Sequence, residues 1–366
     1  MEKFSKLVIG SIMVGFLLNT AAASHAVSLP GDQLVLTEIG QIDTGGQTFD
    51  VQVVGNTAYV ADYASGFRII DVANSTQPVE LGYYRGGGSA HGLYIDGTTA
   101  YVADRFWGLE ILDVSNPTNL TELGRFNDGG HAGNVQVVGT KAYVIDWSEG
   151  LEILDVSDPS NPIELGQWYN GSKQASDVYV VGDMAYVLTN GLRLVNVSDP
   201  TQPVELGHFD DGGIATDVVV SGTLAYVADH IDGLEILNVS DPANPVEIAQ
   251  YYDGGNASGL YIEDNILYLA DWGEGIEILD ISDPVHPREL GQYYDDDNGT
   301  AFKVHVSGDP PLVYLADMEG GLEIISLAGD NSNTGESNIV PSWTFLIAIP
   351  SLVVLVEARR FKREQK

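Results

Sequence analysis

The sequence predicts an all-β fold: a seven-bladed β-propeller of four-stranded antiparallel blades. One tyrosine of a repeated segment (AYVAD in its commonest form) recurs at steps of 42, 42, 43, 40, 42 and 46 residues, at Tyr59, Tyr101, Tyr143, Tyr186, Tyr226, Tyr268 and Tyr314. Repeats of this length that contain several short strands are typical of propeller blades. The runs between glycine and proline are short and rich in β-type residues, which argues against helical repeats of similar length.

The third unit illustrates the four strands that we expect in each blade. They should cover residues 135–138, 142–145, 151–156 and 162–165, with Gly166 ending the fourth strand. Proline cannot donate a hydrogen bond to a sheet, so segments such as Ser157-Asp158-Pro159 are predicted to be turns.

The two ends of the repeat region predict how the ring closes. The seventh unit has candidate strands around 304–306, 313–315 and 322–325, but it lacks the fourth strand of the other units. Residues 37–46 near the N-terminus have the form of that missing strand. We therefore expect the strand near 36–42 to pair with the strand near 322–325, which would remove open sheet edges.

The third-strand segments resemble the LVIVD repeat of bacterial and archaeal cell-surface proteins. They read LEILDVSNP at 109–117, LEILDVSDP at 151–159, LRLVNVSDP at 192–200, LEILNVSDP at 234–242 and IEILDISDP at 276–284. The first unit departs from this pattern with FRIIDVANS at 67–75, and the last departs further with LEIISLAGD at 322–330. The resemblance covers roughly residues 34–327. It implies a propeller at the cell surface and supplies no catalytic residues.

The N-terminal segment predicts export. Lys3 and Lys6 precede an apolar stretch at 7–18, and Ser24-His25-Ala26 has the small-x-small form of a signal-peptidase site. Residues 1–26 are therefore interpreted as a signal peptide, and the propeller domain is expected at 31–328.

The C-terminal segment predicts attachment to the membrane. A polar linker at 329–338 leads into a segment at 339–366, whose apolar part, 339–356, has 18 residues, close to the roughly 20 that span a bilayer. A basic tail follows, as expected on the cytoplasmic side. Together these parts resemble sorting signals that archaeosortase- or exosortase-type enzymes process, with Pro341-Ser342-Trp343 as the candidate motif. A retained transmembrane helix is the alternative.

The charge and the amino-acid composition exclude two classes of function. Residues 31–330 contain 48 acidic and nine basic residues, a net charge of −39. Such a surface repels nucleic acid, so nucleic acid is excluded as a partner. The chain has no cysteine, which excludes cysteine catalysis and thiolate metal sites.

Loops on one face of the disc are the candidate recognition surface. Because alternate hairpin ends lie on the same side of a blade, we expect the second-to-third-strand loops and the fourth-to-first-strand loops to surround one mouth of the central channel. The candidate ligand-binding residues are Trp107, Trp147, Trp272, His230, Asp104, Asp146, Asp229 and Asp271. Exposed aromatic side chains beside fixed charges are typical of binding surfaces. The repeated aspartates have an alternative role, which is to hold the turns.

The sequence contains no catalytic motif of the G-x-S-x-G, H-E-x-x-H or P-loop type. We therefore expect a binding module for a surface protein or glycan. The alternative is an extracytoplasmic hydrolase or lyase with a divalent cation at the channel mouth, which three converging carboxylates or histidines would favour. The one cofactor considered is Ca²⁺, because residues 295–299 resemble a calcium loop, although their phase differs from D-x-D-x-D-G.

Overall fold

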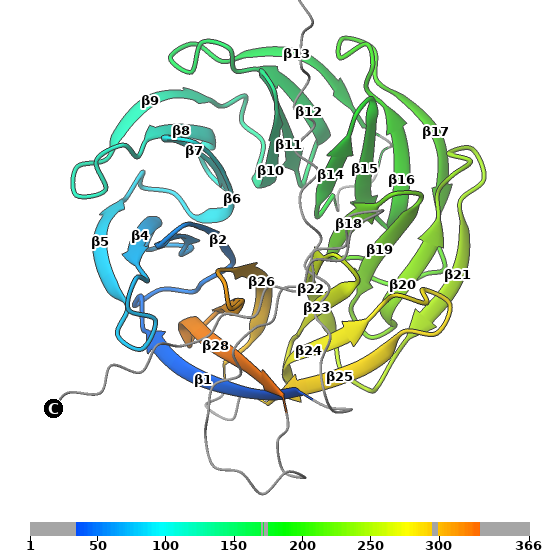
Figure 1. The fold of residues 1–366 in the computed structure, drawn as a ribbon. Coiled ribbons are helices and arrows are strands. Elements are labelled where there is room, and N and C mark those ends of the chain that lie inside the picture. Colours follow the sequence, from blue (N-terminus) through cyan, green and yellow to red (C-terminus); the bar gives the residue numbers. More distant parts are fainter. Residues whose placement is uncertain (1–33, 170, 172–174, 295–298, 330–366) are drawn as a thin grey trace, which may run out of the picture. The chain divides into compact units, whose positions relative to one another are not determined.

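The computed structural model describes residues 34–329 apart from 170, 172–174 and 295–298. These residues form seven four-stranded sheets around a central channel (Figure 1). The predicted seven-bladed propeller is therefore confirmed. Within the described residues, no helix has the length and apolar character needed to cross a membrane. The predicted signal peptide, linker, C-terminal apolar segment and most of the candidate calcium loop lie outside the described residues.

Blades are numbered in chain order, and each runs from its innermost to its outermost strand. Blade 1 contains β2 (Asp50–Val54), β3 (Thr57–Ala61), β4 (Phe67–Asp71) and β5 (Val79–Tyr84); blade 2 contains β6 (Ala90–Asp96), β7 (Thr99–Asp104), β8 (Gly108–Asp113) and β9 (Thr121–Phe126). Blade 3 contains β10 (Ala132–Val138), β11 (Lys141–Asp146), β12 (Gly150–Asp155) and β13 (Ile163–Trp168); blade 4 contains β14 (Val178–Val181), β15 (Met184–Thr189), β16 (Gly191–Asn196) and β17 (Val204–Phe209). Blade 5 contains β18 (Asp217–Ser221), β19 (Leu224–Asp229), β20 (Gly233–Asn238) and β21 (Val246–Tyr251); blade 6 contains β22 (Ala257–Glu263), β23 (Ile266–Asp271), β24 (Gly275–Asp280) and β25 (Arg288–Tyr293). Blade 7 contains β26 (Ala301–Ser307), β27 (Leu312–Asp317), β28 (Gly321–Gly329) and β1 (Leu34–Ile42).

The N-terminal strand closes the ring as predicted. β1 pairs antiparallel with β28, with Leu36 opposite Leu327 and Ile42 opposite Leu322. In Figure 1 this strand lies beside β28 at the outer edge of the seventh blade. The last blade is therefore completed by residues from both ends of the repeat region.

The predicted end of the fourth strand is wrong. In blade 3 the strand continues past Gly166 to Trp168, and the ladder shifts register where Gly166 pairs with Ile153. A Cβ atom on Gly166 would lie 2.4 Å from the carbonyl oxygen of Pro200, in the turn of the next blade. The glycine is therefore required because the next blade approaches closely here, and it does not terminate the strand.

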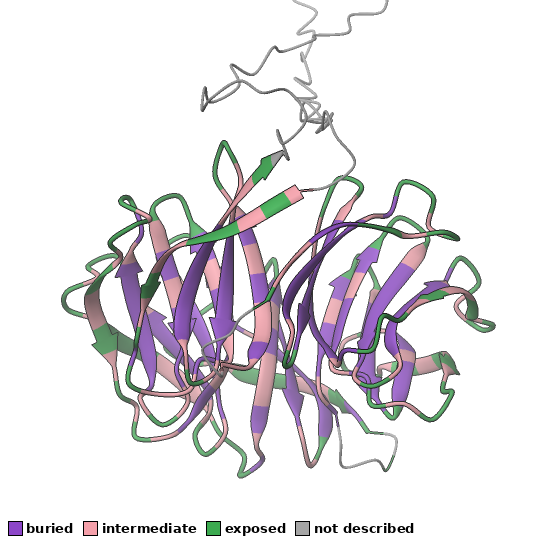
Figure 2. Cartoon of the chain, turned by 90° about the horizontal axis from the view of Figure 1, so that it is seen from below, coloured by how far each residue is buried: buried purple, intermediate pink, exposed green. Residues whose placement is uncertain are grey.

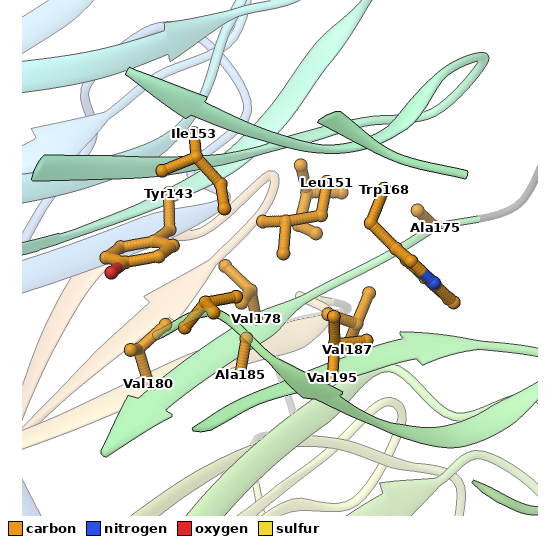
Figure 3. Close-up of a cluster of buried hydrophobic side chains, with 12 residues drawn as sticks. Tyr143, Leu151, Ile153, Trp168, Ala175, Val178, Val180, Ala185, Val187 and Val195 are labelled. Carbon is orange, nitrogen blue, oxygen red and sulfur yellow. The ribbon is translucent and has the colours of Figure 1, made fainter. Parts of the chain in front are cut away.

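The core consists of apolar layers between neighbouring sheets. Between blades 3 and 4, Ile153 and Trp168 pack against Val178 and Val187 (Figure 3). Figure 2 shows that buried residues follow the inner strands, whereas exposed residues gather on the loops and outer strands. Each fully buried Leu, Ile or Val side chain stabilises the fold by roughly 1.5–3 kcal/mol, so these layers hold adjacent blades in a fixed orientation.

Candidate ligand-binding site

A cavity of about 660 Å³ lies where the first strands of the blades begin, at the centre of the ring. Its lining comes from the starts of first strands, from the loops that precede them and from the second-to-third-strand hairpins of blades 3 and 4, in blades 1 to 5 and 7. The two loop sets meet on this face, because in blade 3 Trp147 N donates a hydrogen bond of 3.0 Å to the carbonyl oxygen of His131. The volume lies within the range of small-molecule sites, which is about 300–1,000 Å³.

Four aromatic rings form a continuous arc along one side of the cavity. The ring centroids of Phe302 and Phe49 lie 5.0 Å apart, those of Phe49 and His91 lie 4.3 Å apart, and those of His91 and Trp147 lie 4.8 Å apart. These residues come from blades 7, 1, 2 and 3 and all line the cavity. We call this group the aromatic arc.

Arg105 supports the aromatic arc from the loop that follows β7. Its guanidinium carbon lies 5.2 Å from the centroid of the Trp147 ring, and its Nη1 donates a hydrogen bond of 3.2 Å to Tyr63 Oη. Burial, followed by the charge of Arg105, lowers the pKa of His91 to about 4. His91 is therefore neutral at physiological pH and presents an uncharged ring to the cavity.

The opposite side of the cavity belongs to blades 4 and 5, where polar groups lie beside Ala175, Ala215 and the exposed side chain of Ile214. It includes the exposed side chain of Asn190 and the hydroxyl groups of Ser176, Thr189 and Thr216. Ser176 Oγ donates a hydrogen bond of 2.8 Å to the carbonyl of Ala215, which holds the loops of the two blades together. The mouth of the channel is thus aromatic on one side and rich in hydroxyl and amide groups on the other.

A charged cluster adjoins the aromatic arc, since Asp50 and Lys303 directly follow Phe49 and Phe302 in the chain and line the same cavity. Lys303 Nζ lies 2.7 Å from Asp217 Oδ1 and 3.8 Å from Asp177 Oδ2. Burial alone would lower the pKa of Lys303, but Asp177, Asp217 and Asp50 outweigh it and raise the pKa above its usual range. Burial, opposed by Lys303, raises the pKa of Asp50 to about 6. Two of these carboxylates therefore lie within 4 Å of the ammonium group, and Asp50 adds its charge nearby.

Backbone amides hold the same carboxylates in place. Leu93 N donates to Asp50 Oδ2 at 2.8 Å, and Leu260 N donates to Asp217 Oδ2 at 2.6 Å. In both pairs the donor belongs to the blade that follows the acceptor. The channel aspartates therefore connect adjacent blades as well as surrounding Lys303.

The three predicted tryptophans occupy different environments. Trp147 lines the cavity and packs against the core between blades 3 and 4. Trp107 and Trp272 are 40% and 41% exposed, and neither lines the cavity. His230 contacts Trp272, with ring centroids 4.9 Å apart. The structure thus brings one of the predicted indoles into the cavity and leaves the other two exposed on loops.

The four predicted aspartates are buried and hold the loops. Asp104, Asp146, Asp229 and Asp271 are 1–2% exposed. Asp104 Oδ1 accepts hydrogen bonds from the backbone N–H groups of Phe106 and Trp107, at 2.9 and 3.0 Å. This geometry supports the turn-holding alternative for the aspartates, because one oxygen of each of them accepts a hydrogen bond from a backbone N–H group.

Sequence reasoning missed the beginnings of the first strands. Phe49, Phe302 and Lys303 line the cavity, yet none of them belongs to the set of candidate ligand-binding residues. A signal was present, since Asp50 and Asp177 stand at equivalent positions, directly before valine-rich runs. Only Trp147 belongs both to the candidate set and to the cavity.

The repeat pattern agrees with a known family. A model of the LVIVD repeat matches residues 45–85, 87–128, 129–169, 172–211, 212–253 and 254–295, which together make up more than half of the chain. The chain belongs to the LVIVD repeat family. In this LVIVD-repeat protein, the residues that match the family model end before β26. This agrees with the divergent sequence of the last unit.

Several solved structures share the fold at low sequence identity. The structure of streptogramin B lyase has a TM-score of 0.64 at 11% identity and covers 81% of this chain and 98% of the lyase chain. The β-propeller domain of Cps50 (Swd1) from Myceliophteria thermophila has a TM-score of 0.60 at 13% identity, over 80% of this chain and 99% of that domain. The computationally designed Ika8 protein has a TM-score of 0.57 at 10% identity, over 76% and 82%. These similarities concern the fold alone. No curated protein sequence matches the LVIVD-repeat chain.

Proposed function

We propose that this protein is a cell-surface binding module that takes part of a glycan into the cavity at the channel mouth. The observation that carries the proposal is the asymmetry of the mouth. The aromatic arc lies on one side, and the hydroxyl and amide groups of blades 4 and 5 lie on the other.

This asymmetry favours a ligand with one apolar face and one polar edge. A sugar ring has both, because its C–H face packs on aromatic rings and its hydroxyl groups bond to amides and hydroxyls. An anionic ligand is disfavoured, since the propeller region has a net charge of −39. A neutral surface glycan therefore fits the cavity better than an acidic peptide.

The proposed location rests on the two ends of the sequence. A signal peptide at 1–26 and an apolar segment at 339–356 followed by basic residues support export and attachment to the cytoplasmic membrane or processing by a sorting enzyme. A hydrolase or lyase with a cation at the channel mouth has less support. Two of the carboxylates in the channel already pair with the ammonium group of Lys303.

Binding of soluble neutral oligosaccharides, measured first on an array and then by calorimetry, tests the proposal. Trp147→Ala should weaken binding at least about 30-fold, because truncating an aromatic anchor typically costs about 2 kcal/mol or more. Trp272→Ala is the matched control, since this indole is 41% exposed and does not line the cavity.

Both variants are compared after their melting temperatures show that they are folded. This check matters for Trp147, which also packs against the core. Asn190→Ala, at an exposed position on the polar side, adds a test that leaves the core unchanged. Equal affinity of wild type, Trp147→Ala and Asn190→Ala would refute the proposed site.

A further inference from the structure

Among the described residues, three blades contain a cluster of carboxylates whose members do not line the central cavity. The clusters are Asp128, Glu149 and Glu152 in blade 3; Asp211, Asp229 and Glu235 in blade 5; and Asp253, Asp271 and Glu277 in blade 6. In each cluster, one oxygen from each residue lies within 4.8 Å of the other two. In each cluster, the first aspartate named begins an Asp-Gly-Gly loop. The glutamate named last lies in the third strand of the blade and is a buried member of the cluster.

The glutamates of these clusters are buried and incompletely bonded. Glu152, Glu235 and Glu277 are 4%, 2% and 0% exposed. Glu152 Oε1, Glu235 Oε1, Glu277 Oε2 and also Asp229 Oδ2 are buried without a hydrogen-bond partner among the described residues. No ion pair within 4.0 Å joins these glutamates to a lysine or arginine in the described part of the chain. Buried carboxylates this close together repel one another unless a proton or a cation neutralises them.

In blades 1 and 2 an arginine guanidinium lies at the equivalent site. In blade 1, Arg68 replaces the glutamate, and its Nε lies 2.5 Å from Asp62 Oδ2. In blade 2 the glutamate remains as Glu110, but Arg125 enters from β9 and its Nη2 lies 2.8 Å from Glu110 Oε1. In the loop that precedes β6 of blade 2, Gly86 occupies the position of the loop aspartate.

In blade 4, as in blade 1, an arginine replaces the glutamate of the third strand. Arg193 replaces the glutamate and Thr189 replaces the aspartate at the end of the second strand, with Arg193 Nε donating to Thr189 Oγ1 at 3.2 Å. Three blades thus carry a guanidinium at this position, whereas blades 3, 5 and 6 carry carboxylates with no protein cation among the described residues. The pattern is complementary: where the guanidinium is absent, the carboxylates have no counter-charge from the described part of the protein.

We propose that blades 3, 5 and 6 each bind a calcium-like divalent cation between the Asp-Gly-Gly loop and the third strand. Carboxylate oxygens are the ligands that such hard cations prefer, and Ca²⁺ accepts irregular sets of them completed by water. The loop residues Asp128, Asp211 and Asp253 are exposed, which gives the cation access from solvent.

A calcium titration of the purified full-length chain, by calorimetry at physiological salt, tests this inference. Wild type should bind three ions. Each of Glu152→Gln, Glu235→Gln and Glu277→Gln should lose one ion while the other two remain, and the triple variant should lose all three. Glu110→Gln in blade 2 is the matched control and should still bind three ions, because Arg125 neutralises that site.

The exposed positions provide a second set of variants that spares the core. Asp128→Asn, Asp211→Asn and Asp253→Asn should weaken binding at the same three sites, and circular dichroism should show all variants to be folded. Two outcomes would overturn the inference. One is the absence of calcium uptake, which would mean that the carboxylates share protons instead. The other is a loss of bound calcium in Glu110→Gln equal to the loss in the other glutamate variants, which would mean that calcium binds only to the general acidic surface.

Discussion

Lys303 Nζ lies 2.7 Å from Asp217 Oδ1, which joins the first strands of blades 7 and 5 across the channel. The ammonium group thus compensates carboxylates that come from several blades. A charge in this position connects parts of the ring that do not share a sheet.

Lys303→Met should destabilise the propeller. Removing one partner of a buried pair typically costs about 3–5 kcal/mol, and the lower value is expected here because the lysine side chain is 19% exposed. Urea unfolding measures the change. Adding Asp217→Asn should restore part of the lost stability, because it removes one unpaired carboxylate. An unchanged unfolding midpoint in Lys303→Met would show that the cluster contributes nothing to stability.

Gly166→Ala should lower stability by about 1–3 kcal/mol, the range for an overpacked contact. The reason is the 2.4 Å approach between the added Cβ and the carbonyl oxygen of Pro200. Gly273→Ala is a suitable control, because a Cβ there would meet no atom within 4 Å. Thermal unfolding of the two variants compares them, and similar melting temperatures would contradict the proposed close approach.

Removal of the N-terminal strand should open the ring. Deletion of residues 31–44 takes away β1 and leaves the outer edge of β28 unpaired. We expect a sharp drop in melting temperature together with self-association, measured by calorimetry and light scattering. A monomeric deletion variant with the wild-type melting temperature would contradict the pairing.

Stability should decrease in acid partly because of His305. Burial lowers its pKa to about 4, compared with about 6.5 in an unfolded chain. Since the unfolded state binds the proton more tightly between these values, stability falls as pH decreases from about 6.5 to about 4. The slope for one such group is at most about 1.4 kcal/mol per pH unit.

His305→Gln should therefore lose less stability than wild type between pH 7 and pH 5, as measured by urea unfolding at each pH. His286→Gln, in an exposed turn, should behave like wild type. Parallel curves for His305→Gln and wild type would show that His305 does not contribute to the acid sensitivity.

The number and order of strands could be predicted because each blade is a local meander. Tyr143 and the turn Ser157-Asp158-Pro159 belong to one unit, and their spacing alone indicates where that unit turns. Closure of the ring could also be predicted, because residues 37–46 match the strand that is missing from the last unit. The role of Gly166 was misinterpreted because the need for a glycine at this position comes from the close approach of Pro200, which belongs to another blade.

The candidate site was harder to predict because it is assembled from distant segments. Phe49 and Phe302 lie 253 positions apart in the chain and meet only after the ring closes. Asp217 and Lys303 likewise belong to separate sheets. A repeat pattern shows which positions are equivalent, but it does not show which side chains face one another across a channel.

The pairing of Leu34 with Gly329 places the two ends of the folded ring at the same end of one ladder. A force that pulls these two residues apart would therefore separate β1 from β28 one residue pair at a time, without shearing the whole ladder at once. The seventh blade is consequently the mechanically weakest part of the propeller under tension between its ends. For the same reason, a short peptide joining the two ends would make circular permutants feasible, with new termini in any surface turn.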